Sequence, residues 1–198
     1  MTAHSGPARA ATYRDVLDAP PHMVAEVANG LLHLHPRPPM RHARASFRMA
    51  GQLDGPFFGQ PGGWQLAIEP ELHLGPDIVV PDLAGWRLER MPAYPDAPFF
   101  TLAPDWACEI VSPGTRRFDL TEKRTIYGAN GVGHLWLVDP DARTLEAFAL
   151  AEGFWTLVAA VQDGEDVRAA PFASHAFPLA ALWPDPEPDP DPEPTPQG

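Results

Sequence analysis

The sequence is poor in cysteine and in long apolar runs. Cys108 is the only cysteine among 198 residues, so no disulfide can form within the chain, which is typical of a reducing cytoplasm. No apolar run approaches the roughly 18 residues that a membrane-spanning helix needs. The N-terminus also lacks the apolar segment of a secretory signal. We therefore expect a cytoplasmic protein without a membrane partner.

Positive charge is also scarce. The chain has 14 Lys and Arg against 26 Asp and Glu, a formal net charge of −12. Five of these acids lie in the stretch 184–198, which has no base, so the remaining residues still carry −7. Proteins that bind nucleic acid non-specifically are usually basic. The charge therefore argues against passive DNA affinity, but it allows a site where divalent cations supply positive charge locally.

Composition and length predict one folded domain. Apolar residues make up 44% of the chain and aromatic residues 10%, which indicates a globular core. We place this domain at 12–183, after a flexible N-terminus over 1–11. The stretch 184–198, "PDPEPDPDPEPTPQG", alternates proline with acids and has no hydrophobic residue. It is therefore predicted to be a disordered, extended tail.

The first half of the domain begins with a helix and a hairpin. A short helix is predicted over 12–19. The hairpin covers 23–35, because two apolar runs flank Asn29-Gly30, a dipeptide that accepts the positive φ angles of a type I′ turn.

A longer helix is predicted next, over 41–55. Phe47, Ala50 and Leu53 have helical spacing, and Gly55 is the expected stop.

The second half alternates strands with one helix. The stretches "WQLAIE", "ELHLG", "IVVPDLAGW" and "WACEIV" are extended, and a helix over 115–131 begins at Thr115 and ends at Gly131. "HLWLVD" is a strand buried on both faces, followed by two antiparallel strands that turn near Glu152-Gly153. The fold class is therefore α/β, a central mixed β-sheet flanked by helices, with the N-terminal hairpin and C-terminal antiparallel strands.

One carboxylate interrupts the apolar stretch "WACEIVSPG". Glu109 stands among apolar residues, and a buried carboxylate costs several kcal/mol unless it is paired. Asp82 lies in "IVVPDLAGW", where alternation places it on one strand face with Val80 and Ala84. If the two strands are neighbours, Asp82 and Glu109 converge and repel, and Mg²⁺ or Mn²⁺ would offset that repulsion with oxygen ligands.

The helix after "SPG" can bring a base to this pair. Packed against the sheet, it would direct Lys123 towards Glu109, where a lysine could orient water or stabilise phosphate charge. Tyr127 lies one turn further on the same stripe.

Asp82, Glu109 and Lys123 each also have a simpler interpretation. Asp82 could be a turn residue after Pro81, Glu109 could pair with Arg116 or Arg117, and Lys123 could form an exposed pair with Asp119 worth about 0.3–0.5 kcal/mol. Only the joint pattern favours a site.

Other polar residues are weaker candidates. Glu26 is either an acid near the metals or a half-exposed strand acid, and His42 could line the cleft. His33 and His35 share a strand face that we expect to be solvated rather than a transition-metal site. A stripe on the second helix is either a phosphate-binding surface or an ordinary solvated face; it consists of Arg41, Arg44 and Arg48.

These motifs carry a resemblance. The run from Pro81-Asp82 through "EIVSPGTRRFDLTEKRTIYGANGVGHLWLVDP" resembles the Uma-two family of restriction-endonuclease-like proteins, in the PD-(D/E)XK nuclease superfamily, over 12–183. The resemblance implies metal-dependent phosphodiester hydrolysis, with Asp82 and Glu109 as metal ligands and the Ile110 carbonyl as a third. The superfamily's lysine normally lies two residues after the acid, where this chain has a valine; Lys123 takes its place in the Uma-like pattern.

The expected function is a Mg²⁺- or Mn²⁺-dependent endonuclease acting on nucleic acid, with DNA favoured, and superfamily members suggest a homodimer by analogy. One alternative is a catalytically inactive nuclease-fold protein that acts as a protein-interaction module. A weaker one is a metal-dependent hydrolase of another substrate.

Overall fold

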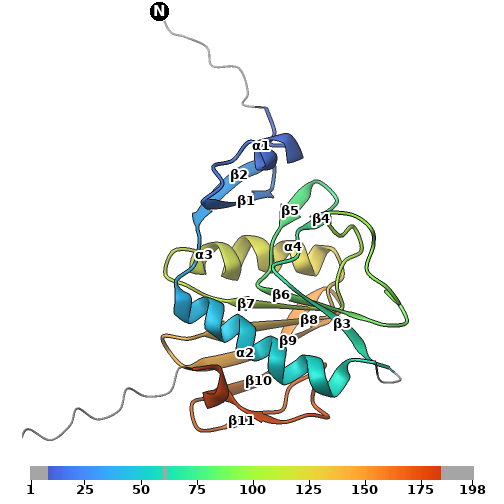
Figure 1. The fold of residues 1–198 in the computed structure, drawn as a ribbon, viewed down its shortest axis with the longest axis vertical. Coiled ribbons are helices and arrows are strands. Elements are labelled where there is room, and N and C mark those ends of the chain that lie inside the picture. Colours follow the sequence, from blue (N-terminus) through green and yellow to red (C-terminus); the bar gives the residue numbers. More distant parts are fainter. Residues whose placement is uncertain (1–8, 60–61, 184–198) are drawn as a thin grey trace, which may run out of the picture.

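The computed structural model describes residues 9–59 and 62–183 (Figure 1). The predicted tail 184–198 and most of the predicted flexible N-terminus lie outside the described residues. The part of that N-terminus which is described lies against the hairpin, because the Ala11 amide donates to the Gly30 carbonyl at 2.8 Å.

A six-stranded mixed sheet forms the centre of the molecule. Its order is β10-β9-β8-β7-β6-β3; β7 and β8 are parallel and the other pairs antiparallel. The expected central mixed sheet is confirmed. Its strands are β3 (Trp64–Ile68), β6 (Leu83–Arg87), β7 (Trp106–Ile110), β8 (His134–Asp139), β9 (Thr144–Ala151) and β10 (Phe154–Gln162).

A smaller sheet carries the hairpin. Its order is β2-β1-β5-β4, and its strands are β1 (Met23–Ala28), β2 (Leu31–Pro36), β4 (Leu72–Leu74) and β5 (Asp77–Val79). The turn is as predicted, with φ of 53° at Asn29 and 76° at Gly30. A two-stranded sheet pairs β11 (Asp166–Val167) with β12 (Phe177–Pro178).

Helices pack on both faces of the main sheet (Figure 1). The helices are α1 (Tyr13–Leu17), α2 (Met40–Phe57), α3 (Arg116–Phe118), the π-helical turn η1 (Asp119–Lys123), α4 (Arg124–Ala129) and the 3₁₀ turn η2 (Leu179–Leu182). Within the described residues, no helix has the length and apolarity that a membrane crossing needs.

Alternation along β7 divides the core in two. Cys108 and Ile110 point to the core that includes Met49 and Leu53 of α2. Ala107 points to the other core, which includes Tyr127 of α4. Cys108 is therefore a fully buried core residue, on the face opposite Glu109.

The buried face of α2 differs in part from the predicted one. Leu53 is buried and Ala50 packs half-buried against the core as expected, but Ala45 and Met49 are the other fully buried residues, and Phe47 is 71% exposed. The spacing of four residues from Ala45 to Leu53 defines the stripe, and it turns Phe47 outward. The helix also continues past Gly55 to Phe57, so the predicted stop is wrong.

The stretch "IVVPDLAGW" is not one strand, as the sequence pattern had predicted. β5 and β6 belong to different sheets, and the chain changes sheets at Pro81. Proline has no N–H to donate to a strand ladder, so it ends the pairing there. Asp82 consequently lies at a bend before β6, not on a strand face beside Ala84.

Candidate active site

Glu109 of β7 is buried and paired. Its side chain accepts a hydrogen bond from Lys123 Nζ at 2.9 Å and one from Tyr127 Oη at 2.5 Å, and the residue is 1% exposed. The predicted alternative, a pair with Arg116 or Arg117, is wrong: Arg116 pairs with Asp139 instead. The cation that a buried carboxylate requires comes from the helix after β7.

Lys123 is the centre of an acidic cluster rather than an exposed residue. It is 3% exposed, and its Nζ donates to the Val80 carbonyl at 2.8 Å. Besides Glu109, Glu26 Oε1 lies 3.3 Å and Asp119 Oδ1 3.7 Å from Nζ. Asp119 and Lys123 begin and end η1, and such π-helical turns are frequent at functional sites.

Asp82 connects three segments at the end of β7. Its Oδ2 accepts the Ile110 amide at 2.6 Å, and its Oδ1 lies 3.2 Å from His42 Nε2. His42 comes from the first turn of α2 and is 6% exposed. Asp82 does lie at a bend after Pro81, but its carboxylate is held at the site by these contacts.

Glu26 fastens the hairpin to the cluster. Its Oε1 accepts the Val80 amide at 2.7 Å, and the residue is 3% exposed. His35 Nε2 of the adjacent strand is 3.8 Å from Glu26 Oε2. Glu26 is therefore a buried acid beside Lys123, and the half-exposed alternative is wrong.

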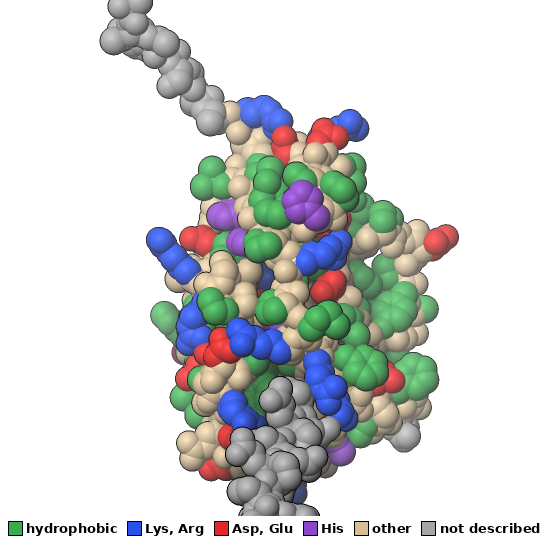
Figure 2. All heavy atoms as spheres, turned by 60° about the vertical axis from the view of Figure 1, so that its left-hand side comes forward, with side chains coloured by type: hydrophobic (Ala, Val, Ile, Leu, Met, Phe, Trp, Pro, Cys, Tyr) green, Lys and Arg blue, Asp and Glu red, His purple; other side chains and the backbone are tan. Residues whose placement is uncertain are grey.

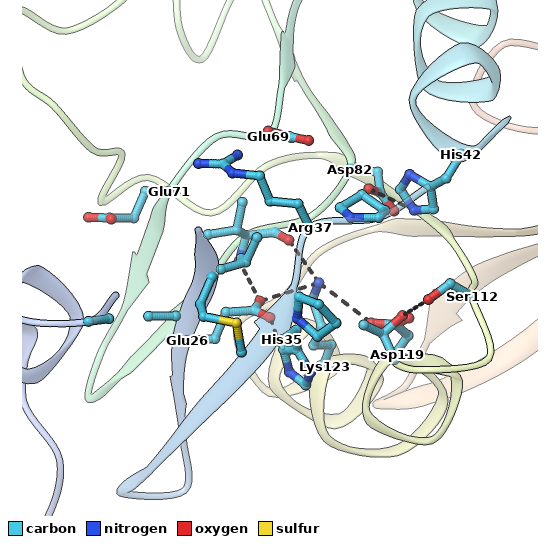
Figure 3. A pocket seen from close by; sticks show the side chains of 18 of the residues that line it. Glu26, His35, Arg37, His42, Glu69, Glu71, Asp82, Ser112, Asp119 and Lys123 are labelled. Atoms are coloured by element: carbon cyan, nitrogen blue, oxygen red, sulfur yellow. Dashed lines mark hydrogen bonds and ion pairs between the residues drawn. The ribbon is translucent and has the colours of Figure 1, made fainter. Parts of the chain in front are cut away.

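These side chains line a cavity of about 380 Å³ (Figure 3). Asp82, Glu109, Asp119 and Lys123 contribute from the main body, and α1 and the hairpin close the opposite side. Tyr127 does not line the cavity among the described residues; it supports Glu109 from within the core.

Negative charge exceeds positive charge in this cluster. Burial lowers the pKa of Lys123, but the facing carboxylates, Glu109 first, outweigh it and raise the pKa well above its usual range. Burial raises the pKa of Asp119 to about 6, although Lys123 and a hydrogen bond from Thr115 oppose the change. Four carboxylates thus face one lysine, and the cluster can accept further positive charge.

The pKa of His42 responds to the same negative charge. Burial lowers the pKa of its imidazole, but the hydrogen bond and charge of Asp82 and the Ile110 backbone outweigh this effect, so the pKa is raised.

The oxygen groups fit a hard divalent cation. No group of three or more His, Cys, Asp or Glu within 9–59 and 62–183 forms a ready metal-ligand set. Mg²⁺, however, is typically held by one or two carboxylates, with water and substrate phosphates completing its shell. Asp82 and Glu109 are two carboxylates of this kind that line the cavity, and the Ile110 backbone is hydrogen-bonded to His42 at the end of β7.

The arginine stripe lies outside the cavity. Its three residues are exposed on α2, and Arg41 is 3.1 Å from Asp141. Figure 2 shows Lys and Arg side chains spread among acidic and apolar ones on this side of the molecule.

Two features of the site were not predicted from the sequence. His33 and His35 pack on Phe118, with ring centroids 4.5 and 5.0 Å away, so they are half-buried rather than a solvated face. Asp119 was predicted as a partner of Lys123 in an exposed pair and as part of the run that resembles the family, but it was given no role at the site. Its spacing of four residues from that lysine was the available signal, because such residues share a helix face.

Comparison with known families decides the classification. The Uma2 family, described as "Putative restriction endonuclease", matches residues 10–181. The chain belongs to the Uma2 family. A crystal structure described as a "putative nuclease belonging to DUF820" from Anabaena variabilis is similar with a TM-score of 0.70 and 22% identity, covering 87% of this chain and 97% of that one. Among curated proteins no match was found.

Uma2 membership confirms the resemblance inferred from the motifs, and the solved neighbour confirms the fold class. The matched region contains every residue of the acidic cluster and both strands of the hairpin. The hairpin that carries Glu26 is thus part of the Uma2 domain and not an addition to it.

Proposed function

We propose that this Uma2 protein is a metal-dependent endonuclease that hydrolyses phosphodiester bonds, with DNA as its substrate. The observation that carries the proposal is the meeting of Asp82, Glu109 and Lys123 around one cavity. They come from separate segments of the chain. Burying charged groups costs free energy, so a cluster of this kind commonly has a functional or structural role. The family description supports the same reaction class.

Each group has a distinct role in the proposal. Asp82 and Glu109, with the Ile110 carbonyl, would hold Mg²⁺ or Mn²⁺. When bound, the ion offsets carboxylate and phosphate charge and makes water more acidic. Lys123 stabilises charge that develops on the phosphate oxygens. Tyr127 orients Glu109 through its hydrogen bond.

DNA contact requires more positive charge than Lys123 and Arg37 bring to this acidic cavity. Arg41, Arg44 and Arg48 are the proposed phosphate contacts, because they are exposed along α2, whose first turn supplies His42 to the site. The proposal includes a homodimer, by analogy with other members of the nuclease superfamily.

The test is cleavage of labelled DNA oligonucleotides, single-stranded and duplex, with Mn²⁺ or with EDTA. Cleavage is expected with Mn²⁺ only, and Asp82→Asn or Glu109→Gln should reduce it roughly 10²-fold or more. Glu146→Gln is the matched control, because Glu146 is exposed and lies in the same cross-strand row as Glu109, through Leu137. Cleavage that persists in EDTA or in both site variants would contradict the proposal.

A folded protein that neither cleaves DNA nor binds Mn²⁺ would instead support the protein-interaction module.

A further inference from the structure

The cavity at the site has two chemically different sides. The side formed by the main body carries Asp82, Glu109, Asp119 and Lys123, that is, all of the charged cluster except Glu26 of the hairpin. The opposite side, from α1 and the hairpin, adds a row of apolar residues beside Glu26 and His35, which Figure 3 labels. Its apolar lining residues include Val16, Ala19, Met23, Val24 and Ala25.

The apolar side indicates that more than a phosphate enters. In a paired duplex the bases are stacked on the inside, and phosphate and sugar are outermost. A backbone lying across the charged side would leave the apolar side without a partner. The face of an unpaired base or its sugar provides such a partner, and bases that are not paired commonly pack on apolar or aromatic side chains.

The size of the cavity agrees with one nucleotide. A volume of about 380 Å³ lies at the lower end of the range of about 300–1,000 Å³ for sites that enclose one small molecule.

The charge of the cavity also disfavours a duplex. Glu69 and Glu71 line it in addition to the acidic cluster, and Arg37 lies on the same side (Figure 3). Duplex DNA carries one negative charge per roughly 1.7 Å of its axis. A single nucleotide carries far less negative charge, so Glu69 and Glu71 repel it less than they repel a duplex.

We propose that the cavity admits one unpaired nucleotide, whose base or sugar packs against the α1 and hairpin side. The substrate class is then single-stranded DNA, or duplex DNA with an unpaired nucleotide. This inference rests on the proposed function, since it takes Asp82 and Glu109 as the place of cleavage.

Three substrates with one labelled strand test the inference with Mn²⁺ present: the single strand, its perfect duplex, and a duplex with one unpaired nucleotide. A perfect duplex must unpair a nucleotide first, so its cleavage should be roughly 10–100-fold slower than that of the other two. In the third substrate, cuts should fall beside the unpaired nucleotide. Equal or faster cleavage of the perfect duplex would overturn the inference.

Filling the apolar side provides the matched variants. Ala19→Trp should slow cleavage of the single strand roughly tenfold while Mn²⁺ binding by calorimetry is unchanged, and Ala25→Phe serves if Ala19→Trp does not fold. Ala173→Trp, at an exposed position outside the cavity, should cleave like wild type. Unchanged cleavage by both filled variants would overturn the inference.

Failure of the proposed function can be told apart from failure of this inference. If wild type cleaves none of the three substrates, that function fails, and fluorescence anisotropy of the same labelled DNAs with Mn²⁺ decides the inference. Preference for the single strand, weakened by Ala19→Trp, supports it. Equal binding of single strand and perfect duplex overturns it.

Discussion

Asp119 is predicted to destabilise the protein once it is ionised. Burial raises its pKa to about 6 from 3.8, a difference worth about 3 kcal/mol at about 1.4 kcal/mol per pH unit. A raised pKa means that the protonated form is favoured in the folded state. The associated stability is present below pH 3.8 and is lost as the pH rises through about 6.

Asp119→Asn should therefore stabilise the protein in a pH-dependent way. Asparagine keeps an oxygen for the Thr115 hydroxyl and carries no charge, and Lys123 keeps Glu109 and Glu26. In metal-free urea unfolding followed by tryptophan fluorescence, the variant should equal wild type near pH 4. It should exceed wild type by up to about 3 kcal/mol at pH 8.

The control is Asp96→Asn at an exposed position, which should change the unfolding free energy little at either pH. If Asp119→Asn is less stable than wild type at pH 8, the ionised carboxylate stabilises Lys123 more than its burial costs, and the reasoning about excess negative charge is refuted.

Three further changes test the packing of the site and core by urea unfolding. Lys123→Met should cost about 3–5 kcal/mol, because it leaves buried carboxylates unpaired, and adding Glu109→Gln should recover part of this; a loss under about 1 kcal/mol would contradict the pairing. Tyr127→Phe should cost about 1–3 kcal/mol by removing a donor to Glu109, and a neutral result would count against that hydrogen bond. Gly85→Ala should cost about 1–3 kcal/mol, since its Cβ would lie 2.8 Å from Leu66 Cδ2; wild-type stability would show that the core can adjust.

The parts of the fold that sequence predicts are those with local signals. Asn29-Gly30 fixes the hairpin turn through positive φ angles at both residues. Gly131, with φ of 73°, ends the helical segment that carries Lys123. Thr115 was less well predicted: it precedes that segment, but its side chain makes no cap hydrogen bond to the helix backbone and instead contacts Ser112 and Asp119.

On α2 only Phe47 was misassigned, because the buried stripe is built largely from small and flexible residues. Phe47 is a larger apolar residue than Ala45 and is therefore the stronger candidate for burial in the sequence. In the structure, however, Ala45 and Met49 pack into the core and Phe47 is exposed.

The residues of the site could be predicted from the sequence, but their arrangement in space could not. Asp82, Glu109 and Lys123 were named from residue type and spacing, but Asp82 was placed on a strand that Pro81 interrupts. Glu26 lies 97 residues before Lys123 and reaches it only because the hairpin pairs with β5. No local pattern encodes such a contact.

The central claim is that Asp82 and Glu109 share one divalent cation, and calorimetric titration of Mn²⁺ into the full chain tests it most directly. Wild type and Glu146→Gln should bind Mn²⁺ with equal affinity, and Asp82→Asn and Glu109→Gln should each bind roughly tenfold or more weakly. Unchanged Mn²⁺ affinity in both site variants, or no binding by wild type, would contradict the account.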